Sequence, residues 1–148
     1  MVFNHNERDT MNEVEVTVEA PAKYASHILE MLAGFRSDAE GRLDLIKSGE
    51  DSGSLEDIHY EKETARLAPP IIDLMMDQAG NDTITITGDS HLLSNAFDFR
   101  MGSLSDELTH VMGVSPVDYP KAKAMLDELG WLVLEGERVD TAYRGAVA

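Results

Sequence analysis

Apolar residues recur at every third or fourth position in the first third of the chain, the spacing that places them on one face of a helix. This helix is expected to begin just after Pro21, because a proline there lacks only a donor that would be unpaired anyway. Gly34 and Gly41 weaken its interior, and the pattern is consistent with a break near either residue. The predicted core-facing stripe consists of Ala25, Ile28, Leu32, Phe35, Ala39 and Ile46.

A second apolar stripe follows an acidic loop over residues 47–54. Ser54 is the predicted N-cap of this helix, and Leu55 begins its apolar side. The pair Pro69-Pro70 is expected to end or sharply kink the helix, because each ring clashes with a preceding carbonyl group. A fresh and largely apolar helix is expected to start at Pro70.

Two short segments alternate between apolar and polar residues, which is the pattern of a strand with one buried face. The first covers residues 13–19, where three valines alternate with glutamates that would protect a sheet edge from other chains. The second covers residues 83–87, with Ile84 and Ile86 on its inner face. Turn and cap residues at 88–90 then predict a helix over about 91–101.

The pattern of the C-terminal third predicts two short helices that are separated by a glycine turn. The helices are expected at about 104–112, capped by Ser103 or Ser105, and at about 116–129. They are expected to end at Gly113 and Gly130, because glycine enters the left-handed conformation at low cost. The residues expected to be buried here are Leu108, Val111, Met112, Val114, Tyr119, Ala122, Leu126 and Leu129.

The end of the chain carries a hairpin signal. Residues 131–134 and 138–143 are rich in β-forming side chains, and the segment Glu135-Gly136-Glu137 joins them. A two-stranded ribbon is therefore predicted after the second of the two short helices.

This order of helix, glycine turn, helix, glycine and hairpin resembles the winged helix-turn-helix family of bacterial, archaeal and phage regulators. Thr109 and Lys123 depart from the family's pattern, which usually has a small alanine at the first position and often an apolar residue at the second. The alternative is an unrelated helical hairpin followed by a β-hairpin. The resemblance covers residues from about 90 to 145 and rests on Leu108, Gly113-Val114-Ser115, Tyr119, Ala122, Leu126 and Gly130.

The predicted fold class is therefore α+β. Residues 1–12 show no periodicity and are expected to be a disordered start. Residues 13–87 are predicted to form an N-terminal layer of a strand and helices, which is also a candidate dimerisation element. Residues 88–148 are predicted to form the winged-helix-like module.

Composition argues against several kinds of chemistry. The 148-residue chain has no cysteine, which excludes disulfides, thiolate catalysis and cysteine-based zinc sites. Its five histidines are dispersed, with no pair at metal-binding spacing, and no glycine-rich phosphate loop is present. We therefore predict no catalytic, cofactor-binding or metal-ligating residues, no cofactor and no enzymatic activity. The lack of a signal peptide or an apolar run of membrane length favours a cytoplasmic protein without membrane attachment.

The formal net charge of −16 is the strongest compositional signal. Acidic residues outnumber basic ones in each third of the chain, so the charge coats the molecule instead of forming a tail. Such a field repels phosphate and attracts basic surfaces. Adaptation to high salt is an alternative origin for the acidity.

Two functions follow from the fold and the charge. The favoured hypothesis is an inhibitor or adaptor that docks onto a basic nucleic-acid-binding surface, such as that of a nucleic-acid-processing enzyme, with carboxylates in place of phosphates. Small phage proteins often act in this way. The predicted partner-binding acids are Glu56, Asp57, Glu61 and Glu63.

The alternative hypothesis is a winged helix-turn-helix transcriptional regulator that binds DNA. Its phosphate contacts would come from Lys121, Lys123, Arg138 and Arg144, four cations among nearby acids. Homodimerisation is left open by either hypothesis.

Overall fold

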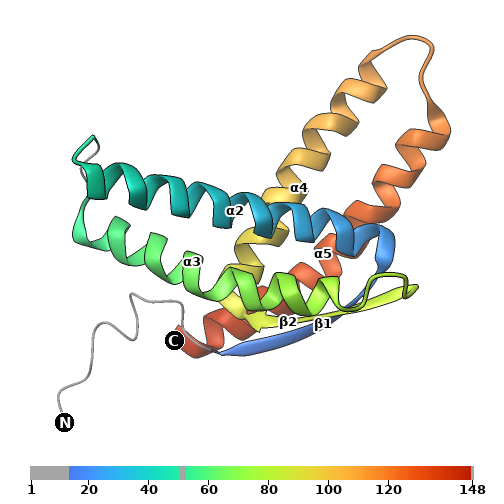
Figure 1. The fold of residues 1–148 in the computed structure, drawn as a ribbon. Helices are drawn as coiled ribbons and strands as arrows, with labels where there is room; N and C mark the ends of the chain where they lie inside the picture. Colours follow the sequence, from blue (N-terminus) through green and yellow to red (C-terminus); the bar gives the residue numbers. More distant parts are fainter. Residues whose placement is uncertain (1–13, 51–52, 148) are drawn as a thin grey trace.

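The computed structural model describes residues 14–50 and 53–147, and these ranges form four helices and a two-stranded antiparallel sheet (Figure 1). The predicted α+β class is confirmed. In chain order the elements are β1 (Glu15–Pro21), α2 (Ala22–Ser48), α3 (Leu55–Met76), β2 (Thr83–Asp89), α4 (Ser90–Gly113) and α5 (Tyr119–Val147).

The helices pair as two antiparallel hairpins that extend from the sheet in different directions (Figure 1). One hairpin consists of α2 and α3, and the other consists of α4 and α5. The distal part of the second hairpin projects from the rest of the molecule, and we call this part, residues 104–129, the arm. The remaining elements surround the main core, which we call the body.

The sheet forms from the two segments that the alternating pattern predicts. Val18 of β1 lies opposite Ile86 of β2, and both side chains are fully buried. The outer edge of β2 is covered by one side chain: the Gln78 amide accepts a 2.8 Å hydrogen bond from the N–H of Thr85 and donates one of 2.8 Å to its carbonyl oxygen. The amide thus takes the place of a neighbouring strand at that residue.

The long helix α2 confirms the first apolar stripe. Ala25, Ile28, Leu32 and Ala39 are buried, and the helix continues through both of its interior glycines without a break. Ser54 caps α3, because its side-chain oxygen accepts a 3.0 Å hydrogen bond from the Asp57 N–H. The stripe and the cap, which depended on spacing and cap chemistry, are confirmed, whereas the break considered near Gly34 or Gly41 is absent.

Of the end or sharp kink expected at Pro69-Pro70, the end is wrong, and so is the fresh helix expected from Pro70, since α3 runs through both prolines to Met76. Each proline removes one backbone hydrogen bond, at a cost of about 3 kcal/mol or more. Ala68 precedes the pair in the core, and Ile71 and Ile72 follow it there. This packing on both sides of the prolines stabilises the continuous helix.

The predicted C-terminal hairpin is also wrong. Residues 131–143 lie inside α5, which runs through Gly130 and Gly136 without a turn. Leu132 and Val139 stand seven residues apart and are both fully buried, so a helical period places them on one core-facing side. That burial outweighs the local turn signal, and the predicted wing is absent from the described residues.

The turn after Gly113 lies where the sequence predicts it, but the helix before this turn is longer than expected. α4 is one helix that begins at the Asp89 cap and ends at Gly113, so a separate helix capped by Ser103 or Ser105 does not exist. α5 begins at Tyr119, and its inward face is set by Ala122, Met125 and Leu132. The expected burial of Met112, Val114, Tyr119 and Leu126 is therefore wrong, with exposures of 49%, 48%, 69% and 56%.

A close contact between β2 and α3 gives a test of the fold. A Cβ atom at Gly88 would lie 2.3 Å from Cδ1 of Ile71, which is a severe clash. Gly88→Ala should therefore lower the free energy of unfolding by about 1–3 kcal/mol in urea melts. Shortening the opposing side chain as well, in Gly88→Ala/Ile71→Ala, should cost less than the sum of the two single changes.

The matched control is Gly102→Ala in α4, where a Cβ meets no atom within 4 Å. It should leave stability unchanged or raise it by about 0.5–1 kcal/mol, because alanine favours helix. A Gly88→Ala variant as stable as this control would contradict the described packing of β2 on α3.

Candidate functional site

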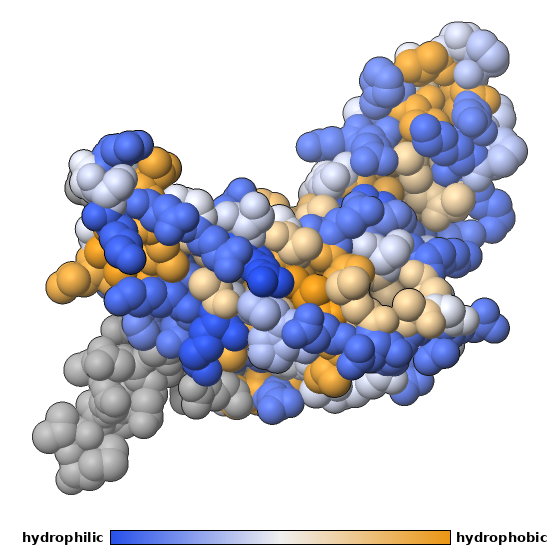
Figure 2. Space-filling model, in the orientation of Figure 1, coloured by the Kyte–Doolittle hydropathy of each residue, from blue (hydrophilic) through white to orange (hydrophobic). Residues whose placement is uncertain are grey.

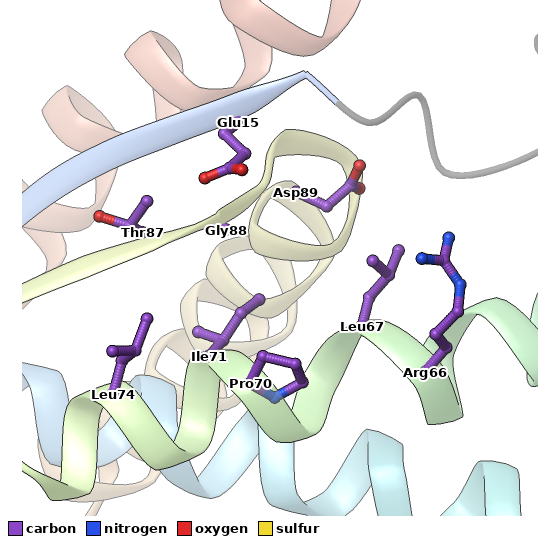
Figure 3. A pocket seen from close by; sticks show the side chains of 9 residues that line it. All are labelled: Glu15, Arg66, Leu67, Pro70, Ile71, Leu74, Thr87, Gly88 and Asp89. Atoms are coloured by element: carbon purple, nitrogen blue, oxygen red, sulfur yellow. The ribbon is translucent and has the colours of Figure 1, made fainter.

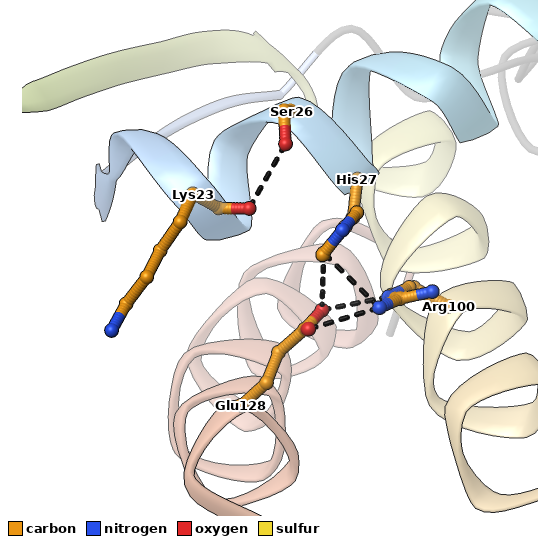
Figure 4. Close-up of polar contacts among 5 residues, drawn as sticks. All are labelled: Lys23, Ser26, His27, Arg100 and Glu128. Atoms are coloured by element: carbon orange, nitrogen blue, oxygen red, sulfur yellow. Dashed lines mark hydrogen bonds and ion pairs between the residues drawn. The ribbon is translucent and has the colours of Figure 1, made fainter. Parts of the chain in front are cut away.

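A buried cluster of charged side chains lies where α2, α4 and α5 cross at the root of the arm (Figure 4). Arg100 of α4 donates two hydrogen bonds to Glu128 of α5, from Nε to Oε2 at 2.7 Å and from Nη2 to Oε1 at 2.9 Å. Both side chains are more than nine-tenths buried. The hydrogen bonds with Glu128 are the main reason that the pKa of Arg100 is raised. The bidentate pair therefore joins the two helices of the arm at its base.

His27 links this pair to α2. Its Nδ1 atom lies 3.0 Å from Oε2 of Glu128 and 3.1 Å from Nη2 of Arg100 (Figure 4). As a donor, this nitrogen would bond Glu128; as an acceptor, it would bond Arg100. Whether Nδ1 donates or accepts, His27 stays bound to one member of the ion pair. The cluster therefore connects the arm to the body.

Aromatic side chains also pack between the same helices. The Trp131 ring lies 5.4 Å from Tyr24 of α2 and 5.4 Å from Phe97 of α4, measured between centroids. Phe35 of α2 contacts Phe99 of α4 edge to face at 5.1 Å. Because both oxygens of Glu128 already accept hydrogen bonds and both charged side chains are buried, the cluster is suited to holding helices in place.

The ion pair makes a prediction about stability. Arg100→Met leaves a buried carboxylate without its partner and should lower the free energy of unfolding by about 3–5 kcal/mol. The double variant Arg100→Met/Glu128→Leu should recover most of that loss, because no uncompensated charge remains. Urea unfolding of the single and double variants measures both effects. A single variant that costs less than about 1 kcal/mol would show that the pair is not buried as described.

A cleft of about 480 Å³ opens between α3 and the sheet (Figure 3). It is lined by Glu15, Arg66, Leu67, Pro70, Ile71, Leu74, Thr87, Gly88 and Asp89. The Asp89 carboxylate accepts the 3.1 Å capping hydrogen bond from Leu92 N–H, and the Thr87 hydroxyl bonds that of Thr17 at 3.0 Å. The lining brings together no nucleophile with an adjacent base. The described residues also contain no group of three or more metal-binding side chains.

The four predicted acidic residues lie in the first half of α3, on different sides of the helix. Glu56 and Asp57 are exposed in the first turn, whereas Glu63 forms an ion pair with Arg66. The pKa of Glu61 is raised, mainly by partial burial and additionally by the carboxylates of Asp57 and of Asp38 on α2, while Arg42 opposes the shift. The structure therefore brings Asp57 and Glu61 together and adds Asp38, which the sequence did not single out; we call these three the acidic cluster.

The four predicted DNA-contacting cations all belong to α5. Three of them form ion pairs within that helix: Lys123 with Asp127, Arg138 with Glu135, and Arg144 with Asp140. Arg138 also donates a hydrogen bond to the carbonyl oxygen of Thr17. Lys121 is exposed near the tip of the arm. These cations extend from residue 121 to residue 144, about 35 Å along a helix, and do not form one cluster.

A group of aromatic side chains that the sequence did not predict joins α3, α4 and α5. It lies near the start of α4 and the end of α5, away from the arm. His91 of α4 stacks on Tyr143 of α5 at 4.4 Å and meets the edge of Tyr60 of α3 at 6.3 Å. Asn95 donates a 3.0 Å hydrogen bond to the Tyr60 hydroxyl. Burial lowers the pKa of His91, against a smaller opposing effect of Asp89. Burial therefore favours the neutral form of the stacked ring.

This lowered pKa gives a pH prediction with a definite sign. The unfolded chain binds a proton at His91 more readily than the folded chain does, so stability is retained above the ordinary pKa near 6.5 and decreases as pH falls below it. His91→Phe keeps the ring and removes the titration. Its free energy of unfolding should therefore fall less than that of the wild type between pH 7 and pH 5. Equal pH dependence in the two proteins, measured in urea, would contradict the assignment.

The buried ion pair of Arg100 and Glu128 was also not predicted, although the sequence contains a pattern that indicates it. Arg100 continues the buried helical series of Leu93 and Phe97, and Glu128 lies between the buried Met125 and Leu132. A charged residue at a core position of a periodic stripe indicates a buried partner of opposite charge.

Comparison of the chain with protein-family models, with curated proteins and with solved structures finds no match. None of the helices in residues 14–50 and 53–147 is long and apolar enough to cross a membrane. A function must therefore be argued from the side chains and their geometry.

Proposed function

We propose that this chain is a non-enzymatic acidic interaction protein that docks onto a basic, nucleic-acid-binding surface of a partner protein, as an inhibitor or adaptor. The observation that carries the proposal is the acidic cluster of Asp38, Asp57 and Glu61, where the pKa of Glu61 is raised mainly by burial and further by carboxylates from α2 and α3, against the opposing effect of Arg42. Arg42 already offsets part of the repulsion among these groups, and a cation from a partner would offset more of it. The net charge of −16 would attract such a partner from a distance.

The arrangement of the basic residues supports the same proposal. Lys123, Arg138 and Arg144 each pair with a carboxylate one helical turn away, so much of their charge is already compensated. A DNA-binding surface needs several cations directed at phosphates, since those contacts supply most of the affinity. The DNA-binding alternative also relied on a wing, and the described helix α5 replaces it. The proposal therefore keeps acidic docking and does not depend on a winged helix.

The position of the acidic cluster suits docking. Asp38 and Asp57 are exposed, and they belong to the hairpin of α2 and α3, which extends away from the arm (Figure 1). Polar side chains dominate much of the visible face of this hairpin, with smaller apolar areas between them (Figure 2). A basic groove that normally holds phosphates could receive such a projecting acidic hairpin.

The proposal predicts that reversing charge at the cluster weakens partner binding. Asp38→Lys/Asp57→Lys should reduce partner capture from a lysate of the source cells by about tenfold or more at 50 mM salt. The difference should shrink toward 500 mM, because salt screens long-range attraction. The captured proteins, identified by mass spectrometry, should be enriched in nucleic-acid-binding enzymes.

The matched control is Asp77→Lys/Asp82→Lys, which makes the same change in net charge at two exposed residues beside the sheet. This control should retain most of the binding. Equal loss in both variants would show that only net charge matters. Tight, salt-dependent binding of the wild type to a defined DNA duplex, abolished by Lys121→Ala/Lys123→Ala, would overturn the proposal in favour of the DNA-binding alternative.

A further inference from the structure

An apolar stripe is exposed along the outer side of α5. Tyr119, Leu126 and Val133 follow one another at intervals of seven residues, and their exposures are 69%, 56% and 53%. Leu134 lies beside the last of them and is 70% exposed. Because a helix turns by about 100° per residue, Tyr119, Leu126 and Val133 share one face with Leu134 at its edge, roughly 100° around the helix from the buried Met125 and Leu132.

Gly130 lies at the centre of this face. A Cβ atom there would meet nothing within 4 Å, so the position is open to a neighbouring molecule. Glycine in a helix interior costs about 1 kcal/mol relative to alanine, and nothing within the chain requires it here. A residue without a side chain does allow the backbone of a second helix to approach closely.

Residues at equal distances from Gly130 on its two sides complement each other. Leu126 and Leu134 stand four residues before and after it, and both are exposed and apolar. Lys123 and Glu137 stand seven residues before and after it, both exposed and opposite in charge, and Lys123 also forms an ion pair with Asp127 one turn away. Two copies of α5 that run antiparallel about a two-fold axis at Gly130 would therefore place Leu126 against Leu134 and Lys123 against Glu137, twice each.

Two shallow depressions on the surface of α5 are related by the same two-fold axis. One shallow depression, of about 520 Å³, is lined on α5 by Tyr119, Pro120, Ala122, Lys123 and Leu126, with Met112 of α4 on its other side. A second, of about 490 Å³, is lined on α5 by Leu134, Glu137, Arg138, Thr141 and Ala142, with Val16 of β1 on its other side. The two-fold axis exchanges four residues of the first set with four of the second. Each depression would thus face the other depression of the second copy.

We propose that this face of α5 is a self-association surface, and that its occupant is a second, antiparallel copy of α5 centred on Gly130. The helix carries five acidic and four basic side chains, so two copies would meet with little local repulsion although each chain has a net charge of −16. This places self-association on α5 and not on the N-terminal element that the sequence suggested. The acidic cluster remains on the other hairpin, so the inference does not depend on the proposed function.

The expected dimer is weak. The stripe from Tyr119 to Thr141 covers 22 residue steps, about 33 Å of helix, and one helix pair buries less than the roughly 800 Å² per partner of a standard interface. A dissociation constant of about 10–100 μM is expected. Salt near 300 mM would screen the repulsion between the two acidic chains.

Sedimentation analysis of the full chain from about 5 μM to 1 mM tests this inference. The average mass should rise with concentration from 16.3 kDa toward twice that value. Lys123→Glu and Glu137→Lys should each weaken association by about tenfold, because each places like charges together, whereas the combined Lys123→Glu/Glu137→Lys should restore it. Lys121→Glu is the matched control: it makes the same charge change on the opposite side of α5 and should leave association unchanged.

Gly130→Leu supplies a second, independent test. The leucine side chain would occupy the space in which the two helices approach each other, so it should abolish the dimer. The monomer has open space at this position and should fold with an unchanged or higher melting temperature. A wild type that stays monomeric up to 1 mM would overturn the inference, and so would a dimer that persists in Gly130→Leu. Failure of the charge swap to restore association would overturn the proposed antiparallel register.

Discussion

A buried ion pair holds this molecule together at the point where three of its helices cross. Burying two charges costs several kcal/mol per ion, and the pair is stable only because Arg100 bonds both oxygens of Glu128. His27 extends the contact to α2, so the same few atoms position the arm against the body. Glu128 can reach Arg100 only if α5 is already helical there, and the buried Leu132 and Val139 continue that helix beyond it. The burial of these groups explains why residues 131–143 form part of a helix and not a wing.

Much of the first half of the fold could be predicted from the sequence, because its elements have regular periods and clear caps. The stripe of α2, the Ser54 cap and the buried Ile84 and Ile86 follow from spacing alone. The C-terminal half could not be predicted in this way, since Gly130 and Gly136 act as turn residues only when nothing packs against their neighbours. A Cβ at Gly136 would lie 3.5 Å from the Phe97 ring, and such contacts between distant segments decide in favour of a continuous helix.

The candidate sites were predictable to a smaller degree. Charge sign and composition indicated an acidic surface, and Asp57 and Glu61 do lie together, but only the pairing of α2 with α3 adds Asp38. The cations of α5 looked available in the sequence, whereas Lys123, for example, forms an ion pair with Asp127 one turn away. The proposed roles use different surfaces: carboxylates on one hairpin for a basic partner, and a nearly neutral apolar face of α5 for a second copy. The separation allows both contacts at once.

The central claim is that carboxylates of this protein occupy a surface on which a partner binds nucleic acid. Competition by DNA tests it most directly. A captured partner that is held by the immobilised wild-type chain should be released by increasing amounts of duplex DNA at constant ionic strength, because the two ligands share one basic site. An equal concentration of phosphate charge supplied as inorganic phosphate should release far less. A partner that binds the duplex while remaining fully attached to the protein would contradict the account.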